Sequence, residues 1–207
     1  TLPSNTPSFT SLPIEIGVSL DGAAQREKRH RPMWEIRAER PEDAPLVEAL
    51  TEQSFGPGRY AKSAYRLREG VAAEPGLSFI AVEDAILRGS VRFWPVTVGK
   101  EPSLLLGPLA VQTDQRGRGI GISLMQRGLH EAQMKAYRSV ILVGDLPYYG
   151  RVGFGPVKRG SIKFPGPVDA ARILGIALVD GALATLEGAV HRARIDDPVC
   201  ADGAGMG

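Results

Sequence analysis

The sequence predicts one α/β domain of the α+β type, built on a mixed, mostly antiparallel sheet flanked by helices. Two runs rich in β-branched and aromatic residues, at 77–82 and 86–98, and a third, apolar run at 104–111 are separated by short turns, which favours an antiparallel meander. An amphipathic helix and an apolar strand follow at 121–136 and 139–143, the pattern of a parallel strand-helix-strand unit. With 207 residues, the chain is long enough for one sizeable core and short for two.

Composition excludes several classes of function. A short basic run at 26–31 contributes more than the whole net charge of +2, so the rest of the chain lacks the broad basic face of a nucleic-acid-binding protein. No apolar run approaches the length of a membrane span, no signal-peptide pattern opens the chain, and no His/Cys cluster has metal-ligand spacing. The single cysteine, Cys200, is interpreted as an incidental thiol. We therefore expect a cytoplasmic protein without nucleic acid, membrane or metal partners.

Three regions follow from the distribution of residue types. Residues 1–33 are rich in Pro, Ser and Thr and are expected to form an N-terminal extension, with one candidate strand at 13–18. The basic run within it is either a docking patch or a solvated linker. Residues 34–195 form the predicted domain, and residues 196–207 a flexible tail.

The domain is expected to begin with a strand at 34–37 and two helices. Pro41 and the two acidic residues after it suit the first turn of a helix. The buried side of this helix is predicted to consist of Leu46, Val47, Leu50 and Phe55. The second helix, 59–69, is expected to pack through Tyr60, Ala64 and Leu67, and its basic residues are expected in solvent: Arg59, Lys62, Arg66 and Arg68.

The third strand of the meander carries a proline in its interior. Because Pro108 cannot donate to a ladder, we expect a bulge at Gly107-Pro108. The bulge would leave backbone groups of Leu109, Ala110 and Val111 free of the neighbouring strand. An extended, amide-bearing ligand could then pair with them as if it were another strand.

Glycines at alternate positions follow this strand and open the next helix. Gly117, Gly119 and Gly121 tolerate positive φ and leave space, so successive backbone N–H groups can point at one anion. The first turn of the helix adds unpaired N–H groups and the positive end of its dipole. A phosphate or pyrophosphate is the expected occupant. The segment that would hold it consists of Arg116, Gly117, Arg118, Gly119, Ile120 and Gly121.

Spacing separates the phosphate loops that compete for this segment. A Walker loop needs a Lys-Ser or Lys-Thr pair after its glycines, and a dinucleotide-binding turn needs G-x-G-x-x-G; neither is present. The segment resembles instead the R-x-x-G-x-G loop, here Arg116, Gly119 and Gly121, which binds the pyrophosphate of acyl-CoA in the GCN5-related N-acetyltransferase (GNAT) family. The alternative is a glycine-rich turn without a ligand.

The helix and strands after the loop complete the predicted sheet. The buried side of the helix is expected to consist of Ile122, Met125, Leu129, Ala132 and Ala136. The strand at 139–143 is predicted to run parallel to the strand before the loop, and 158–164 and 173–179 are predicted as the last, antiparallel strands. Residues 181–190 either end the sheet or contact a second copy of the chain, and in the second case the protein would be a homodimer.

A second motif follows the strand at 139–143. Tyr149 stands four residues before the pair Gly153-Phe154 and directly after Tyr148, in a segment that begins with Asp145. The segment resembles the YhbS-type predicted acetyltransferases, a subgroup of the GNAT family. Together the two motifs cover about residues 104–155, and the meander extends the resemblance to Trp34.

The resemblance implies the GNAT acyl-CoA N-acyltransferase fold, with acetyl-CoA as co-substrate between two splayed central parallel strands. An amine attacks the thioester directly, and a backbone N–H near Leu109 to Val111 can stabilise the developing oxyanion. The phenol of Tyr149 can protonate or hydrogen-bond the departing thiolate. Tyr148 is the second candidate for that role. The alternative is that both tyrosines only pack their rings against Phe154.

The base is less well defined, because 104–111 lacks the glutamate that many family members carry before the loop. Asp145 is the candidate that positions a water or binds a cationic amine, or else it caps the turn to Pro147. The expected activity is transfer of the acetyl group of acetyl-CoA to a primary amine of a small molecule or protein. Two alternatives remain: a sensor or docking module that binds acyl-CoA or an acyl carrier without fast turnover, and transfer of a longer acyl chain past apolar residues around Trp94 and 104–106.

Overall fold

The structure is a computed structural model that describes residues 34–57 and 63–193. The predicted extension (1–33) and tail (196–207), Cys200, and Arg59, Tyr60 and Lys62 of the second predicted helix lie outside the described residues. Those interpretations therefore stay predictions. None of the helices in the two described ranges is long and apolar enough to cross a membrane.

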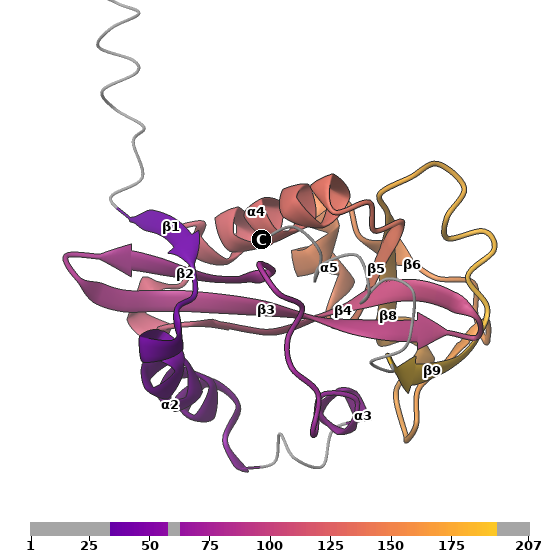
Figure 1. Cartoon of the computed structure of the whole chain (residues 1–207), viewed down its shortest axis with the longest axis horizontal. Coiled ribbons are helices and arrows are strands. Elements are labelled where there is room, and N and C mark those ends of the chain that lie inside the picture. Colours follow the sequence, from indigo (N-terminus) through magenta and orange to yellow (C-terminus); the bar gives the residue numbers. More distant parts are fainter. Residues whose placement is uncertain (1–33, 58–62, 194–207) are drawn as a thin grey trace, which may run out of the picture. The chain divides into compact units, whose positions relative to one another are not determined.

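A sheet of mixed strand direction forms the centre of the domain (Figure 1). Its main path runs β1-β2-β3-β4-β5-β8-β6, and β9 pairs with both β3 and β7. The strands are β1 (Glu35–Ala38), β2 (Ser78–Glu83), β3 (Ile86–Val98), β4 (Glu101–Val111), β5 (Ser139–Val143), β6 (Gly155–Pro156), β7 (Ile162–Lys163), β8 (Ile173–Ala177) and β9 (Gly188–Arg192). Among these strands, β4 with β5 and β7 with β9 pair in parallel, and the other pairs are antiparallel. The predicted fold class is confirmed.

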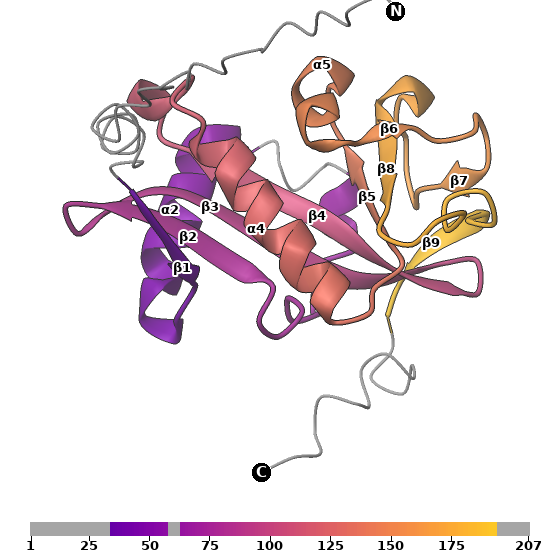
Figure 2. The ribbon, with the colours of Figure 1, turned by 90° about the horizontal axis from the view of Figure 1, so that it is seen from above.

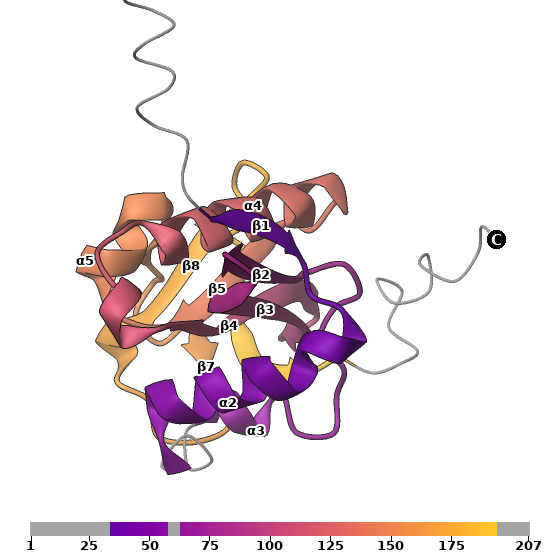
Figure 3. The same cartoon turned by 90° about the vertical axis from the view of Figure 1, so that its left-hand side faces the viewer.

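Helices cover both faces of this sheet. They are α2 (Ala44–Phe55), α3 (Ser63–Arg66), α4 (Ile120–Met134) and α5 (Leu146–Tyr149). Figure 3 shows α4 on one face and α2 with α3 on the other. The two faces carry separate apolar clusters, one under α4 that contains Phe79, Phe93 and Leu124, and one that contains Leu67, Leu105 and Ile141.

The pattern of α4 places it directly on the sheet. Met125, Leu129 and Ala132 are buried as predicted. Gly128 permits the close approach, because a Cβ at this position would lie 2.2 Å from the ring of Phe93. The prediction was wrong for Ala136, which is exposed because the helix ends at Met134.

Two predictions on the first helices were wrong in detail. Val47 and Leu50 of α2 are buried, but Leu46 is 59% exposed and Phe55 is 37% exposed. Thr51 is buried on this side of the helix instead of Leu46 and Phe55. Its burial is tolerated because its hydroxyl donates to the carbonyl oxygen of Val47 at 2.8 Å.

Arg68, expected in solvent, is drawn inward instead. Its Nε atom is buried, and Leu67 beside it is 3% exposed. The helical stretch predicted to reach residue 69 ends at Arg66 as α3, so Arg68 no longer follows the helical face on which the prediction placed it.

The last part of the sheet also differs from the prediction. Of 158–164, only Ile162–Lys163 are extended, and they pair in parallel with β9 rather than antiparallel with β8. Strand β9 itself arises at the end of the segment that the sequence left open. Alternation along a strand identifies its faces but not its partner, and this is why the pairing was missed.

The bulge predicted in β4 is confirmed. Val91 of β3 faces Leu109, whereas Phe93 faces Leu106, so β4 holds one residue more than β3 over this interval. The indole N–H of Trp94 donates to the carbonyl oxygen of Gly107 over 2.5 Å. The bulge is therefore anchored from the neighbouring strand.

Candidate functional site

Strands β4 and β5 separate in the middle of the sheet. Their parallel register comprises two pairs, Leu104 with Val140 and Leu105 with Ile141, after which β4 continues to Val111 without β5. Figure 2 shows β5, β8 and α5 diverging from the β1–β4 half of the sheet beside α4. The free edge of β4, the start of α4 and α5 thus surround one opening.

The glycine loop lies at one side of this opening. Gly117 and Gly119 have φ values of +81° and +94°, which side chains rarely adopt, and Gly119 is the residue from which α4 starts. A Cβ added at either glycine would meet no atom within 4 Å, so the loop borders open space. Open space, backbone N–H groups and the N-terminus of a 15-residue helix thus lie together, and this combination suits the binding of an anion.

A cavity of about 280 Å³ joins the loop to the tyrosine pair. Its lining contains every predicted loop residue except Arg118. The lining residues are Ser54, Phe55, Leu109, Ala110, Val111, Gln115, Arg116, Gly117, Gly119, Ile120, Gly121, Ile122, Tyr148, Tyr149 and Arg151. The two sequence motifs, about 30 residues apart in the chain, therefore meet at one cavity.

Arg118 is turned away from this cavity. Its guanidinium forms an ion pair with Glu83 at 2.6 Å and lies 5.2 Å from the ring centroid of Trp34. The partner carboxylate raises the pKa of Arg118, and Arg118 in turn lowers the pKa of Glu83. Arg118 thus ties the loop to β2, and its side chain is not available to the cavity.

The edge of β4 that faces the opening follows from the hydrogen-bond register. The Gln112 N–H donates to the Arg88 carbonyl of β3 at 2.9 Å. Because backbone groups in an antiparallel strand alternate between its two edges, Ala110 also points to β3, and Leu109 and Val111 point away from it. The backbone groups of these two residues therefore line the free edge, whereas the prediction was wrong for Ala110, whose backbone groups face β3.

The two tyrosines of α5 take different positions. Tyr148 lies over the start of α4, since a Cβ on Gly121 would be 2.1 Å from the Tyr148 hydroxyl. Tyr149 packs over Gly144, where a Cβ would be 2.2 Å from its ring. The rings meet edge to face at 5.2 Å, and Tyr149 also packs edge to face on Phe154 at 6.2 Å. The alternative to a catalytic role was packing of the tyrosine rings on Phe154. Tyr149 does pack on Phe154 through its ring, and this contact leaves its hydroxyl available.

Both phenols are protonated at neutral pH. Burial, with smaller contributions from Tyr148 and Asp145, raises the pKa of Tyr149 to about 12. Burial also raises the pKa of Tyr148. Tyr149 therefore presents an O–H donor and not an anion.

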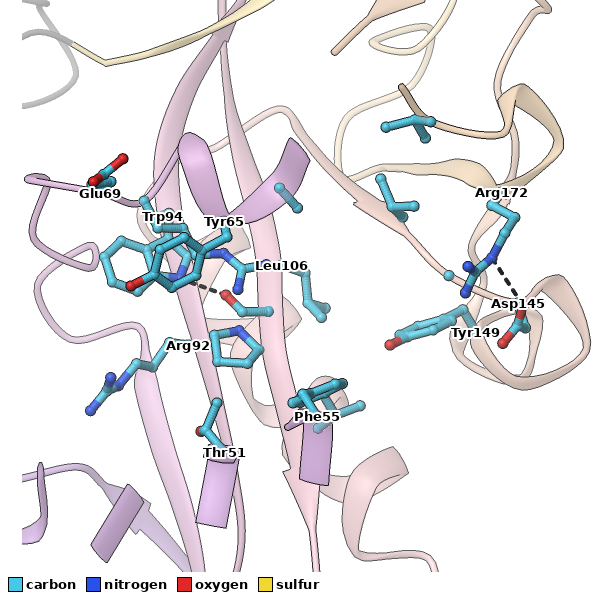
Figure 4. Close-up of a pocket in the computed structure, with 18 of the residues that line it drawn as sticks. Thr51, Phe55, Tyr65, Glu69, Arg92, Trp94, Leu106, Asp145, Tyr149 and Arg172 are labelled. Atoms are coloured by element: carbon cyan, nitrogen blue, oxygen red, sulfur yellow. Dashed lines mark hydrogen bonds and ion pairs between the residues drawn. The ribbon is translucent and has the colours of Figure 1, made fainter. Parts of the chain in front are cut away.

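A second cavity, of about 600 Å³, lies on the other side of Tyr149. Figure 4 shows Trp94, Tyr65, Arg92 and Thr51 on one wall and Tyr149, Asp145 and Arg172 on the other, with the Tyr149 hydroxyl directed between them. Three residues line both cavities: Phe55, Leu109 and Tyr149. These residues mark the place where the two cavities meet.

The charged residues of the larger cavity are mostly paired. Arg92 forms an ion pair with Glu39 and, at 2.6 Å, with Glu48. Asp145 forms one with Arg172 at 3.2 Å. The side chain of Asp145 makes no capping hydrogen bond to α5. The alternative role predicted for it, capping of the turn to Pro147, is therefore wrong.

Several lining residues were missed by sequence reasoning as site residues. Phe55 was assigned to the core and Arg68 to solvent, while Arg92 and Thr51 received no role. Trp94 and Leu106, noted for their apolar character, do line the cavity, but Leu104 and Leu105 are buried in the core. No local signal identifies the four missed residues, since Thr51 and Phe55 lie on α2, Arg92 lies on β3 and Arg68 follows α3. Within the described ranges, no group of three or more His, Cys, Asp or Glu side chains could hold a metal ion.

Comparison with known proteins places the chain. The sequence model of the Acetyltransferase (GNAT) family matches residues 34–154. The uncharacterized N-acetyltransferase YhbS of Escherichia coli (strain K12) is 34% identical over 160 residues, covering 75% of this chain and 94% of that protein.

Two crystal structures share the fold. That of YhbS from Escherichia coli in complex with CoA has a TM-score of 0.68 and 31% identity, covering 79% of this chain and 92% of the other. That of a GNAT family acetyltransferase from Brucella melitensis in complex with acetyl-CoA has a TM-score of 0.60 and 29% identity, covering 79% and 97%. The chain belongs to the GNAT family of acetyltransferases.

Proposed function

We propose that this protein transfers the acetyl group of acetyl-CoA to a primary amine of a small molecule or protein. The observation that carries the proposal is the meeting of two cavities at Leu109 and Tyr149. The smaller cavity opens on an anion-binding loop, and the larger one on polar and aromatic side chains suited to a second substrate. The junction supplies a backbone edge and a phenol, the two groups that acyl transfer from a thioester needs.

The residues present fit acetyl-CoA. The open loop around Gly117 and Gly119, with Arg116 on the cavity wall, would hold the pyrophosphate. The free edge at Leu109 and Val111 would pair with the amides of the pantetheine arm. When bound, acetyl-CoA supplies the acetyl group as a thioester, whose sulfur is the leaving atom.

The chain's own groups then act on charge and protons. The amine nitrogen of the acceptor forms a bond to the carbonyl carbon, the carbon-sulfur bond breaks with its electron pair on sulfur, and the amine loses one proton. The N–H of Leu109 or Val111 stabilises the negative charge on the carbonyl oxygen. The hydroxyl of Tyr149 donates to the sulfur, and Asp145, on the cavity wall, receives the amine's proton through water.

The position of Tyr149 favours it over Tyr148 for the donor. Tyr149 lines both cavities, whereas Tyr148 lines only the smaller one and lies over the loop. A donor to the leaving sulfur must lie at the junction, where the acyl group changes partners. Tyr148 is assigned to the binding side.

Thiol release with a panel of amines tests the proposal. Wild-type protein and Gly119→Glu are mixed with acetyl-CoA and small primary amines or lysine peptides, and CoA affinity is measured by calorimetry. The glutamate places a negative charge where the negatively charged pyrophosphate of CoA would bind, so CoA affinity should fall at least about 10-fold. Equal CoA affinity in the two proteins would refute the loop assignment. CoA binding without turnover on any amine would favour the sensor or docking module instead.

A further inference from the structure

Arg68 is the exception among the arginines of the larger cavity. Arg92 and Arg172 are paired with carboxylates, as described above. Arg68 also lines the cavity, yet its buried Nε atom has no hydrogen-bond partner among the described residues. No ion pair joins it to a carboxylate of residues 34–57 or 63–193.

The guanidinium of Arg68 lies against the bulge of β4. Gly107, with φ of +122°, leaves space for it, because a Cβ at Gly107 would be 3.1 Å from Nη2 of Arg68. Tyr149 and Tyr65 are the described titratable side chains close enough to influence the pKa of Arg68. The cation therefore points into the part of the cavity between the bulge and Tyr149.

A buried and unpaired charge is costly to a folded protein. Removing a guanidinium from water is repaid only when hydrogen bonds or a counter-charge replace the water. Burial accordingly lowers the pKa of Arg68, although arginine stays charged at neutral pH. Within the described chain nothing provides the counter-charge, so a ligand that carries one would be bound favourably.

We propose that the acceptor is an amine that also carries a carboxylate, which Arg68 receives. This inference rests on the proposed function and specifies its substrate class. A guanidinium matches a carboxylate through two parallel N–H···O bonds, and a single negative charge balances the one unpaired cation. A dianionic phosphate would instead lie with excess charge among the carboxylates of the cavity wall, which are those of Glu48, Glu69, Asp145 and Asp169.

The geometry also limits the spacing between the two groups of the acceptor. Arg68 contacts the bulge at Gly107, and the acetyl position lies beside Leu109, two residues further along β4. Two residues of strand span at most about 7 Å. The amine and the carboxylate are therefore separated by a short chain, as in α-, β- and γ-amino acids, rather than by a polymer.

The test uses amines that differ only in their acidic group. Glycine, β-alanine and γ-aminobutyrate are compared with their carboxamides, and aminomethylphosphonate is added as the dianionic probe. Binding to the CoA-saturated protein is measured by calorimetry, and acetylation by thiol release. In the wild type, at least one acid should bind about 10-fold to 100-fold more tightly than its amide, the range expected for hydrogen bonds to a charged group.

Variants separate recognition from structure. Arg68→Met should reduce the acid-to-amide ratio to about 1 while its Tm stays at or above that of the wild type, because an unpaired and partly buried charge is removed. Arg68→Lys keeps the positive charge but loses the paired N–H donors of the guanidinium, so it should retain part of the preference for acids over amides. This variant also tests the proposal if Arg68→Met does not fold. Arg66→Met, an exposed arginine two residues earlier, is the matched control.

Failure of the substrate class and failure of the enzyme are distinguishable. A protein that prefers acids in the binding assay but acetylates none supports the site at Arg68 and contradicts turnover. A protein that acetylates amines without preferring acids overturns the carboxylate proposal alone. The same follows if no acid binds, if the phosphonate binds best, or if the preference survives in Arg68→Met.

Discussion

Replacing Tyr149 with phenylalanine removes one hydroxyl and little else. The ring packs edge to face on Tyr148 and Phe154, contacts that a phenyl ring retains. The loop that we assign to CoA lies at the other end of the smaller cavity. Tyr149→Phe should therefore leave CoA affinity within a few fold and affect the chemical step.

The magnitude follows from the acidity of the phenol. With its pKa at about 12, Tyr149 is a weaker acid than an ordinary thiol, for which the pKa is about 8.5. Complete proton transfer to a thiolate would be uphill by about 3.5 pK units, or about 5 kcal/mol. We therefore expect Tyr149 to keep its proton and to donate a hydrogen bond to the developing charge. Such a bond contributes about 1.5 to 3 kcal/mol, so kcat should fall about 10-fold to 100-fold.

Steady-state thiol release measures this change on an amine from the panel. Tyr148→Phe is the matched control and should reduce kcat much less, because its hydroxyl lies over Gly121. Since Tyr149 stays protonated well above neutral pH, its titration should not lower kcat between pH 7 and 10. Wild-type kcat in Tyr149→Phe would refute the donor role, and a loss confined to Tyr148→Phe would move the role by one residue.

Three further changes test other parts of the structure. Gly144→Ala should lower kcat and Tm together, because its Cβ would lie 2.2 Å and 2.6 Å from ring atoms of Tyr149; Gly155→Ala, with no atom within 4 Å of its added Cβ, is the control, and equal kcat in both variants would contradict the packing. Asp43→Asn should lower the free energy of unfolding at pH 7 by about 1 to 2 kcal/mol, measured by urea unfolding with the exposed Glu42→Gln as control. The Arg37 hydrogen bond lowers the pKa of Asp43 from 3.8 to about 2. Its contribution is therefore present above pH 4 and lost as the pH falls from about 4 to 2, and an identical acid unfolding curve in Asp43→Asn would show that the pair adds nothing. Removal of residues 1–32, so that the chain begins at Met33, should leave CoA affinity within a few fold, because both cavities are built from residues after Trp34; calorimetry that shows lost binding would mean that the extension completes the fold.

Those parts of the candidate site that are local in the chain could be predicted from the sequence. The loop that we assign to the pyrophosphate is a run of backbone groups before one helix, so the spacing of Gly117, Gly119 and Gly121 is enough to predict it. The bulge at Gly107-Pro108 follows from the missing N–H of one proline. The helix after the loop could be predicted because its apolar period is long and regular.

Which side chains from separate elements share a cavity could be seen only in the folded chain. Arg118 belongs to the predicted loop by sequence, but Glu83 on β2 draws its side chain away. Spacing in the sequence favoured Tyr149 over its neighbour Tyr148, but only Gly121 on α4 and Gly144 after β5, over which the two side chains lie, give them different positions. Arg68 is charged and so was expected in solvent, yet the turn after α3 carries it to the bulge of β4. Burial and charge pairing depend on contacts across the sheet, which no local pattern encodes.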